Sequence, residues 1–105
     1  MNRPHFLSIQ KMQFGDEYEW DPQKAASNLA KHGVAFEEVV FFEWDDALII
    51  EDGRRDYGEP RYLAYGLIGN RLHALVFTPR NGRIRVISLR KANSRELRIW
   101  QRSRR

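Results

Sequence analysis

The stretch that decides the fold is residues 61–89, RYLAYGLIGNRLHALVFTPRNGRIRVISL, in which three apolar, β-branched runs alternate with two turn signals. Gly69-Asn70 and Asn81-Gly82 are residue pairs that accept the backbone angles of a tight hairpin turn. A fourth run, before the turn signal Asp52-Gly53, has the same character. The pattern therefore predicts consecutive antiparallel strands at Ala47–Glu51, Arg61–Ile68, Arg71–Thr78 and Arg83–Leu89.

Helix signals stand on both sides of these strands. Asp21-Pro22 combines an N-cap carboxylate with a proline whose φ suits a first helical turn, and Gly33 is a typical left-handed residue after a helix ending near His32. Residues 36–42 indicate a second, short helix. A last helix is predicted from Asn93, with Glu96 completing a capping box. We expect Leu97 and Trp100 to anchor it while its arginines face outward.

An alternating stretch from Gln13 to Trp20 predicts one more strand at the start. The order strand, two helices, four strands, helix indicates an α+β fold, with an antiparallel β-sheet (a meander), two N-terminal helices and a C-terminal helix. We expect helices against the sheet and one face free for a ligand. At 105 residues and 42% hydrophobic content, the chain suits one core. Residues 13–105 are predicted to be a single domain and residues 1–12 a leader or alternative-start extension.

Composition excludes several classes of chemistry. The chain has no cysteine, which removes disulfides, thiolate metal sites and cysteine nucleophiles. No two histidines have helical metal-ligand spacing, and the glycines match no phosphate-binding loop, so we expect no metal and no cofactor. The sequence contains no apolar run of membrane-spanning length and no secretory signal pattern. We expect a cytoplasmic protein without a membrane partner.

Charge is distributed unevenly along the chain. Residues 1–78 contain 8 Lys and Arg against 13 Asp and Glu, whereas residues 79–105 contain 10 against one. A strongly basic last quarter on an acidic body favours a polyanionic partner such as RNA, or an acidic protein segment. A solvated basic tail is the simpler alternative.

Several polar residues at predicted strand ends suit cleavage of a phosphodiester. RNA carries its own nucleophile, the 2′-hydroxyl, so an enzyme needs a base, a stabiliser of phosphate charge and a proton donor. Guanidinium groups bind two phosphate oxygens at once. The alternatives are that Glu59 and Arg61 form a cross-face ion pair, that His32 only caps its helix, and that the whole protein is a passive RNA-binding module. One alternative places His73, in an alternating strand, on the open face of the sheet. The candidate residues are Glu59, Arg61, Arg85, Arg90 and Lys91, with His32 as a second possible base.

Ordered blocks across most of the chain are similar to one known family. They are Tyr18-Glu19-Trp20-Asp21-Pro22, Lys24-Ala25, Asn28, Lys31-His32-Gly33-Val34, Phe36-Glu37-Glu38, Glu59-Pro60-Arg61, Ala64-Tyr65-Gly66, Gly69-Asn70-Arg71-Leu72, Arg85-Val86-Ile87-Ser88-Leu89-Arg90-Lys91-Ala92 and Glu96. Together these blocks, from about Tyr18 to Trp100, resemble the BrnT toxins of type II toxin–antitoxin systems.

This resemblance implies a RelE-like fold and a ribonuclease that arrests growth by cutting RNA. It also implies neutralisation by a BrnA-like antitoxin with a ribbon-helix-helix domain, a heterotetramer with two copies of each chain, and contact with operator DNA only through the antitoxin. The positions that match the family's motifs are Lys31, His32, Glu59, Arg61, Arg90 and Lys91.

The roles that we assign to these positions leave two alternatives open. Glu59 or His32 is the base, Arg61 and Arg90 stabilise the phosphate, and Lys31 or Lys91 positions the substrate or donates a proton. Arg85, Arg95 and Arg98 are expected to bind RNA. The competing hypothesis is a non-catalytic RNA- or antitoxin-binding module that acts as a co-repressor of its own operon.

Two departures from the family pattern concern the site. Many relatives carry His-Ser or a similar polar pair before the glutamate, where this chain has Asp56-Tyr57-Gly58. Leu89 replaces the small residue or methionine that usually precedes the family's arginine. The first departure bears on the identity of the general base.

Overall fold

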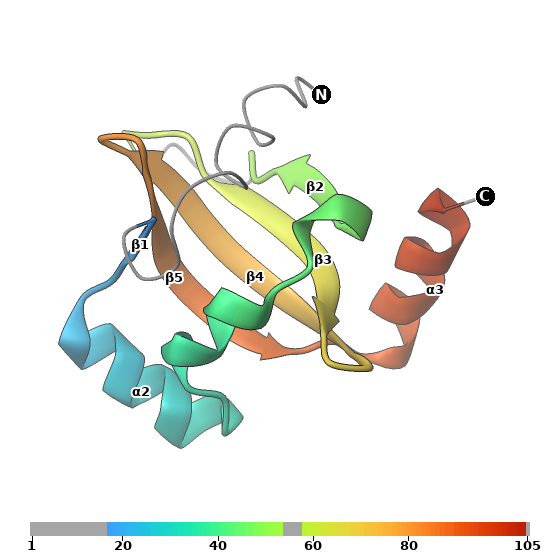
Figure 1. The fold of residues 1–105 in the computed structure, drawn as a ribbon, viewed down its shortest axis with the longest axis horizontal. Coiled ribbons are helices and arrows are strands. Elements are labelled where there is room, and N and C mark those ends of the chain that lie inside the picture. Colours follow the sequence, from blue (N-terminus) through green and yellow to red (C-terminus); the bar gives the residue numbers. More distant parts are fainter. Residues whose placement is uncertain (1–16, 54–57, 105) are drawn as a thin grey trace.

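The computed structural model describes residues 17–53 and 58–104. It contains a five-stranded sheet with the strand order β1-β5-β4-β3-β2 (Figure 1). The predicted leader and the beginning of the strand predicted from Gln13 lie outside the described residues. The elements, in chain order, are β1 (Tyr18–Glu19), α2 (Pro22–His32), the 3-10 helices η1 (Phe36–Phe41) and η2 (Trp44–Asp46), β2 (Leu48–Glu51), β3 (Tyr62–Ile68), β4 (Arg71–Arg80), β5 (Arg83–Lys91) and α3 (Ser94–Ser103).

The predicted meander is confirmed for the four strands from β2 to β5, which pair antiparallel in sequence order. Asn81 and Gly82 both have positive φ angles, 54° and 75°, as a two-residue hairpin turn requires. Strand β4 is longer than predicted and runs through Pro79. Proline is tolerated there because β3 begins opposite Phe77, so that side of β4 has no ladder to complete at Pro79.

The prediction of a purely antiparallel sheet is wrong. Strand β1 lies at the edge beyond β5 and runs parallel to it, with Tyr18 opposite Ile84. The Arg83 guanidinium donates to the carbonyl of Tyr18 at 2.9 Å and ties the two strands together. More than sixty residues separate these strands in the sequence, so no local signal indicates which edge β1 joins or in which direction.

The helix after β1 has the ends that the sequence predicts. The Asp21 carboxylate accepts from the backbone N–H of Gln23 at 2.9 Å, and Gly33 has a left-handed φ of 73°. The buried Asn28 then fixes α2 to the sheet. Its side chain donates to the carbonyl of Leu89 at 2.7 Å and accepts from the N–H of Leu89 at 3.2 Å. This amide therefore continues the pairing along β5 where β1 stops.

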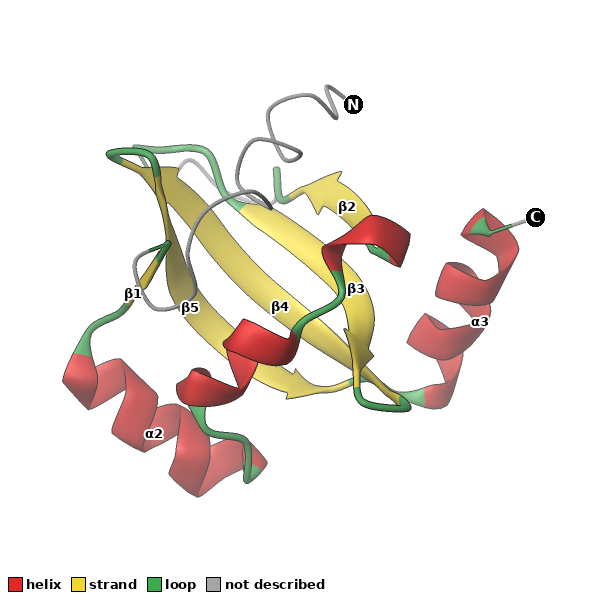
Figure 2. Ribbon diagram, in the orientation of Figure 1, coloured by secondary structure: helices red, strands yellow, loops and turns green. Residues whose placement is uncertain are grey.

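One face of the sheet is covered by α2, which packs against β5, and by η1, which packs against β5 and β3 (Figure 2). Phe36, Leu75 and Phe77 are fully buried in the core between these layers. Burying a side chain of this size stabilises the fold by roughly 1.5–3 kcal/mol. Gly66 on β3 leaves room for the Phe42 ring, since a Cβ at this position would overlap it.

The opposite face is not wholly free, contrary to expectation. Helix α3 packs on one end of it, where Trp100 joins a second apolar cluster with Tyr65 and Leu72. The prediction that Leu97 anchors this helix is wrong, because Leu97 is 38% exposed while Trp100 is 8% exposed. The predicted capping box of α3 is present. We call the part of this face that α3 does not cover the open face.

Candidate functional site

The open face is hollowed beside the first turn of α3. The hollow has a volume of about 460 Å³. Its floor consists of side chains from the three central strands, and residues after β2 form part of its rim. The lining residues are Ile50, Glu51, Asp52, Gly53, Leu63, Tyr65, Val76, Ser88, Arg90 and Glu96. A largely apolar floor with a few polar groups at one end is typical of a ligand site.

The polar end of this hollow is a closely bonded pair. Arg90 donates from Nη1 to Oε1 of Glu96 at 2.9 Å and from Nη2 to Oε2 at 2.7 Å. The same carboxylate accepts from the backbone N–H of Asn93 at 2.9 Å. The hydroxyl of Tyr65 donates to it at 3.4 Å. Glu96 therefore caps α3 and holds an arginine of β5 at the same time.

Electrostatics in this cluster favour the charged pair. The hydrogen bonds from Arg90 are the main reason that the pKa of Glu96 falls to about 2. The bond to Glu96 likewise raises the pKa of Arg90. Burial, followed by the nearby Glu96 charge, raises the pKa of the Tyr65 hydroxyl. At neutral pH the cluster therefore consists of a guanidinium, a carboxylate and a neutral phenol.

A second group of arginines lies at the opposite end of the same face. Arg85 pairs with Glu19 of β1 at 3.1 Å, and Arg80 donates to both carboxylate oxygens of Glu59 at 3.0 Å. Arg85 points to the open face because its neighbours Ile84 and Val86 are buried on the other one. The predicted alternative, in which Glu59 forms an ion pair with Arg61, is wrong. Glu59 pairs with Arg80. Arg85 is also not a strand end but lies inside β5.

The two ends of the open face are separated along the strands. Arg90 is opposite Ala74 of β4, and Arg85 is opposite Thr78, four residues further on. Four residues of strand span about 13 Å. The carbonyl of Pro60 accepts from Thr78, so Glu59 and Arg61 belong to the Arg85 end. Contact with both ends therefore requires a ligand longer than one phosphate group.

The other predicted site residues lie on the α2 side of the sheet. Lys31 and His32 form the last turn of α2. Lys91 alternates with the buried Leu89 and so shares the face that α2 covers. The structure thus divides the predicted site between two faces, which meet at the end of β5.

The alternative that places His73 on the open face is wrong. His73 alternates with Leu75 and Phe77, which are buried on the α2 side. It is 6% exposed, and its Nδ1 lies 2.9 Å from the carbonyl oxygen of Arg71. Burial lowers its pKa, so the ring is neutral at physiological pH. His73 is a packed residue of the sheet.

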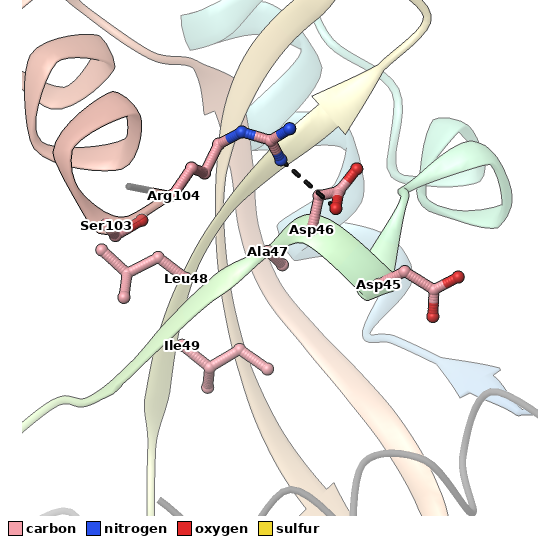
Figure 3. Close-up of a pocket in the computed structure, with 7 residues that line it drawn as sticks. All are labelled: Asp45, Asp46, Ala47, Leu48, Ile49, Ser103 and Arg104. Carbon is pink, nitrogen blue, oxygen red and sulfur yellow. Dashed lines mark ion pairs between the residues drawn. The ribbon is translucent and has the colours of Figure 1, made fainter.

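Arg95 and Arg98 are exposed on α3, as predicted. Arg104 is exposed, as predicted, and in addition pairs with Asp46 at 3.3 Å and lies over the Trp100 ring. This pair crosses a second hollow, of about 400 Å³, between η2, β2 and the end of α3 (Figure 3). The Arg104–Asp46 pair therefore holds the C-terminal end of α3 against η2.

Within residues 17–53 and 58–104, no three His, Asp or Glu side chains cluster closely enough to hold a metal ion. No helix in these same ranges is long and apolar enough to cross a membrane.

Glu96 and Tyr65 are the residues of the hollow that sequence reasoning did not assign to a site. The sequence predicts only a capping role for Glu96, and the structure confirms that role. Its second partner, Arg90, lies on the strand before the helix, and only the turn between them brings the two together. Tyr65 alternates with Ala64 and Gly66 in β3. This alternation indicates which face of the sheet the Tyr65 side chain occupies, but not which residue it contacts.

Comparison with known proteins bears on the whole arrangement. Residues 20–96, about three quarters of the chain, match the family described as the ribonuclease toxin BrnT of type II toxin–antitoxin systems. The matched region begins at Trp20, directly after β1, and ends at Glu96. It therefore includes both ends of the open face. A comparison with individually curated proteins finds no significant match. The chain therefore belongs to the BrnT family of ribonuclease toxins of type II toxin–antitoxin systems.

Proposed function

We propose that this chain cleaves RNA on the open face of its sheet, without a metal ion, through the 2′-hydroxyl of the substrate. The observation that carries the proposal is that each of three arginines on this face is held by a carboxylate. The pairs are Arg80–Glu59, Arg85–Glu19 and Arg90–Glu96. Fixed guanidinium groups suit the binding and stabilisation of phosphate oxygens, because they stay charged and need no reorganisation.

The proposed reaction assigns one task to each group. Glu59 accepts the proton of the 2′-hydroxyl, whose oxygen forms a bond to phosphorus while the bond from phosphorus to the 5′-oxygen breaks. Arg61, at the same end of the open face, binds oxygens of the scissile phosphate, and Arg85 binds the neighbouring backbone. Arg90, about 13 Å away along the strands, binds a phosphate further along the RNA. Of the two candidate bases, Glu59 is favoured over His32 because it lies beside arginines of the open face. The departing 5′-oxygen takes a proton from solvent, and Lys31 or Lys91, on the α2 side of the sheet, positions the RNA.

The partner that we propose is a BrnA-like antitoxin with a ribbon-helix-helix domain. A type II toxin requires a protein antitoxin, and the basic last quarter of this chain suits an acidic segment of such a protein. We also propose a heterotetramer with two copies of each chain, operator binding only through the antitoxin, and action in the cytoplasm, where substrate RNA lies. The meander with flanking helices supports a RelE-like fold.

The decisive experiment uses the purified full chain, freed from antitoxin, with single-stranded RNA in excess EDTA. We expect cleavage that leaves 2′,3′-cyclic phosphate and 5′-hydroxyl ends. Removing one stabiliser of transition-state charge costs about 10²–10³-fold in rate, so Arg61→Ala should lose that much. Glu59→Gln should lose activity as well. Arg102→Ala, which removes an exposed arginine of α3, is the matched control and should cleave normally.

Loss of cleavage in EDTA, with recovery on adding Mg²⁺, would contradict metal independence. Equal activity of Arg61→Ala and the folded wild type would remove Arg61 from the site. If the free, folded wild type leaves RNA intact, the non-catalytic co-repressor becomes the better hypothesis. The exposed Arg95 and Arg98 favour that alternative, since they offer charge for binding without enclosing a substrate.

A further inference from the structure

Arg90 has more hydrogen-bond donors than its partners use. A guanidinium carries five N–H groups arranged as forks. The Arg90 side chain directs one fork, between Nη1 and Nη2, at the two oxygens of Glu96, and Nη1 also donates to the carbonyl of Lys91 at 3.3 Å. Its Nε–H and second Nη2 hydrogen have no hydrogen-bond partner among residues 17–53 and 58–104. These two donors form a second fork.

The side chain that carries the second fork lies at the hollow and is partly exposed. The Arg90 side chain is 33% exposed and lines the hollow, whereas the Glu96 side chain beside it is only 6% exposed. Most of the exposed surface of this pair therefore belongs to the arginine. A fork of two parallel N–H groups matches two oxygens of a phosphate.

Glu96 is itself held in place from two other directions. The backbone N–H of Asn93 fixes Oε1 through the first turn of α3, and the Tyr65 hydroxyl reaches Oε2 from β3. A carboxylate bonded on three sides cannot follow a moving arginine. It therefore sets the plane in which the Arg90 guanidinium lies.

We propose that Glu96 is a positioning residue for RNA, which binds one fork of Arg90 and so presents the other fork to a phosphate in the hollow. The inference rests on the proposed function for the identity of the ligand. It concerns a residue that does not touch the RNA and acts only through Arg90. Tyr65 contributes by holding the carboxylate.

The direction in which one substitution changes the RNA affinity distinguishes this role from simple electrostatics. Glu96→Gln removes a negative charge next to a binding site for a polyanion. By charge alone, the variant should bind RNA more tightly. If Glu96 positions Arg90, the variant should bind RNA more weakly, because an amide offers one acceptor in place of two and turns N–H donors towards the guanidinium.

The measurement is equilibrium binding of a short 2′-O-methyl RNA, which lacks the nucleophile and is not cleaved. We expect Glu96→Gln to bind 5- to 10-fold more weakly than the wild type. Glu37→Gln changes the charge equally at an exposed position of η1 and should bind at least as tightly as the wild type. Unchanged or tighter binding by a folded Glu96→Gln variant would overturn the inference.

A purely structural role of Glu96 predicts a different pattern. Glutamine can serve at this position of a capping box, so Glu96→Gln should keep the helix start. Asn93→Ala removes the cap side chain that accepts from the Glu96 N–H, but leaves the Glu96 carboxylate facing Arg90. We expect Asn93→Ala to lower the melting temperature while RNA affinity stays within two-fold. Equal losses of RNA affinity in both variants would show that Glu96 acts only through α3.

A double substitution completes the test. Arg90→Ala should weaken RNA binding about 10-fold, and adding Glu96→Gln to it should change affinity by less than two-fold, because the positioned group is gone. A further full loss would show that Glu96 acts independently of Arg90 and would overturn the inference. If the variants bind RNA as expected but the wild type does not cleave unmodified RNA, the proposed ribonuclease chemistry is overturned and the positioning role remains.

Discussion

The face of the sheet beneath α2 and η1 is closed and apolar, whereas the face that carries Arg85 and Arg90 is half open and held by ion pairs. Both faces use the same central strands, with alternate side chains pointing to each. The first buries Phe36, Leu75 and Phe77 completely. The second leaves partly exposed arginines, each paired with a carboxylate. Stability should therefore depend mainly on the first face and RNA cleavage on the second.

The largest expected effect on stability is on the closed face. Phe36→Ala should lower the free energy of unfolding by about 3–5 kcal/mol, because it removes a fully buried ring and leaves a cavity. Chemical denaturation measures this loss. Phe41→Ala, in the same 3-10 helix but 63% exposed, is the matched control and should change stability by less than about 1 kcal/mol. Similar losses in both would break the distinction between closed and open surfaces.

Acid should destabilise the open face through Glu96. Its pKa is about 2 in the fold, against an ordinary value of 4.5, so the folded state binds this proton less readily than the unfolded state. The stabilisation is complete above about pH 4.5 and disappears as the pH falls towards 2, and it amounts to about 3 kcal/mol. Unfolding free energies measured from pH 6 to 2 should show a shallower decline in Glu96→Gln. An identical pH dependence in the variant would contradict this assignment.

Close packing over β3 provides a third test of the closed face. Gly66→Ala places a methyl group inside the Phe42 ring position and should cost roughly 1–3 kcal/mol of stability. Adding Phe42→Leu should recover part of the loss by making room. Gly53→Ala is the control, since no atom of residues 17–53 and 58–104 lies within 4 Å of its Cβ position. If the two glycine substitutions have equal effects in a thermal melt, the ring contact is not the cause.

The smallest expected effect on stability belongs to Arg85. Its pair with Glu19 is partly exposed, so Arg85→Ala should cost less than about 1 kcal/mol. RNA binding by the same variant should lose about one phosphate contact, which lowers the salt dependence of log affinity by roughly 0.7. A binding titration at several salt concentrations measures both quantities. An unchanged slope would remove Arg85 from the RNA path.

Local signals accounted for the parts of the fold that depend on neighbours in the chain. The Asn81-Gly82 turn, the Asp21 cap and the Gly33 helix end each follow from the backbone preference of one or two residues. Alternation in β3 to β5 likewise predicted the strands. The predicted chemistry of Arg90 and Glu59 rested on residue type and family resemblance, which indicate what a side chain does but not which partner holds it.

Contacts between distant segments account for the errors. The parallel β1, the pairing of Glu59 with Arg80 and the burial of His73 all depend on which surfaces meet in the folded chain. The expectation that one face would be free failed because α3 turns back onto the sheet and buries Trp100 there. Its amphipathic pattern predicted a buried stripe but not the surface that covers it.

The sequence by itself determined the order of helices and strands, the basic last quarter and, through its motif blocks, the BrnT family. These properties depend on local conformational preference and on residue identity. Only the tertiary structure decided that Lys31 and His32 lie on one side of the sheet and Arg85 and Arg90 on the other, and that Glu96 holds Arg90. The physical reason is that burial, ion pairing and strand register depend on which distant segments come into contact, and those contacts form only when the sheet and its helices pack together.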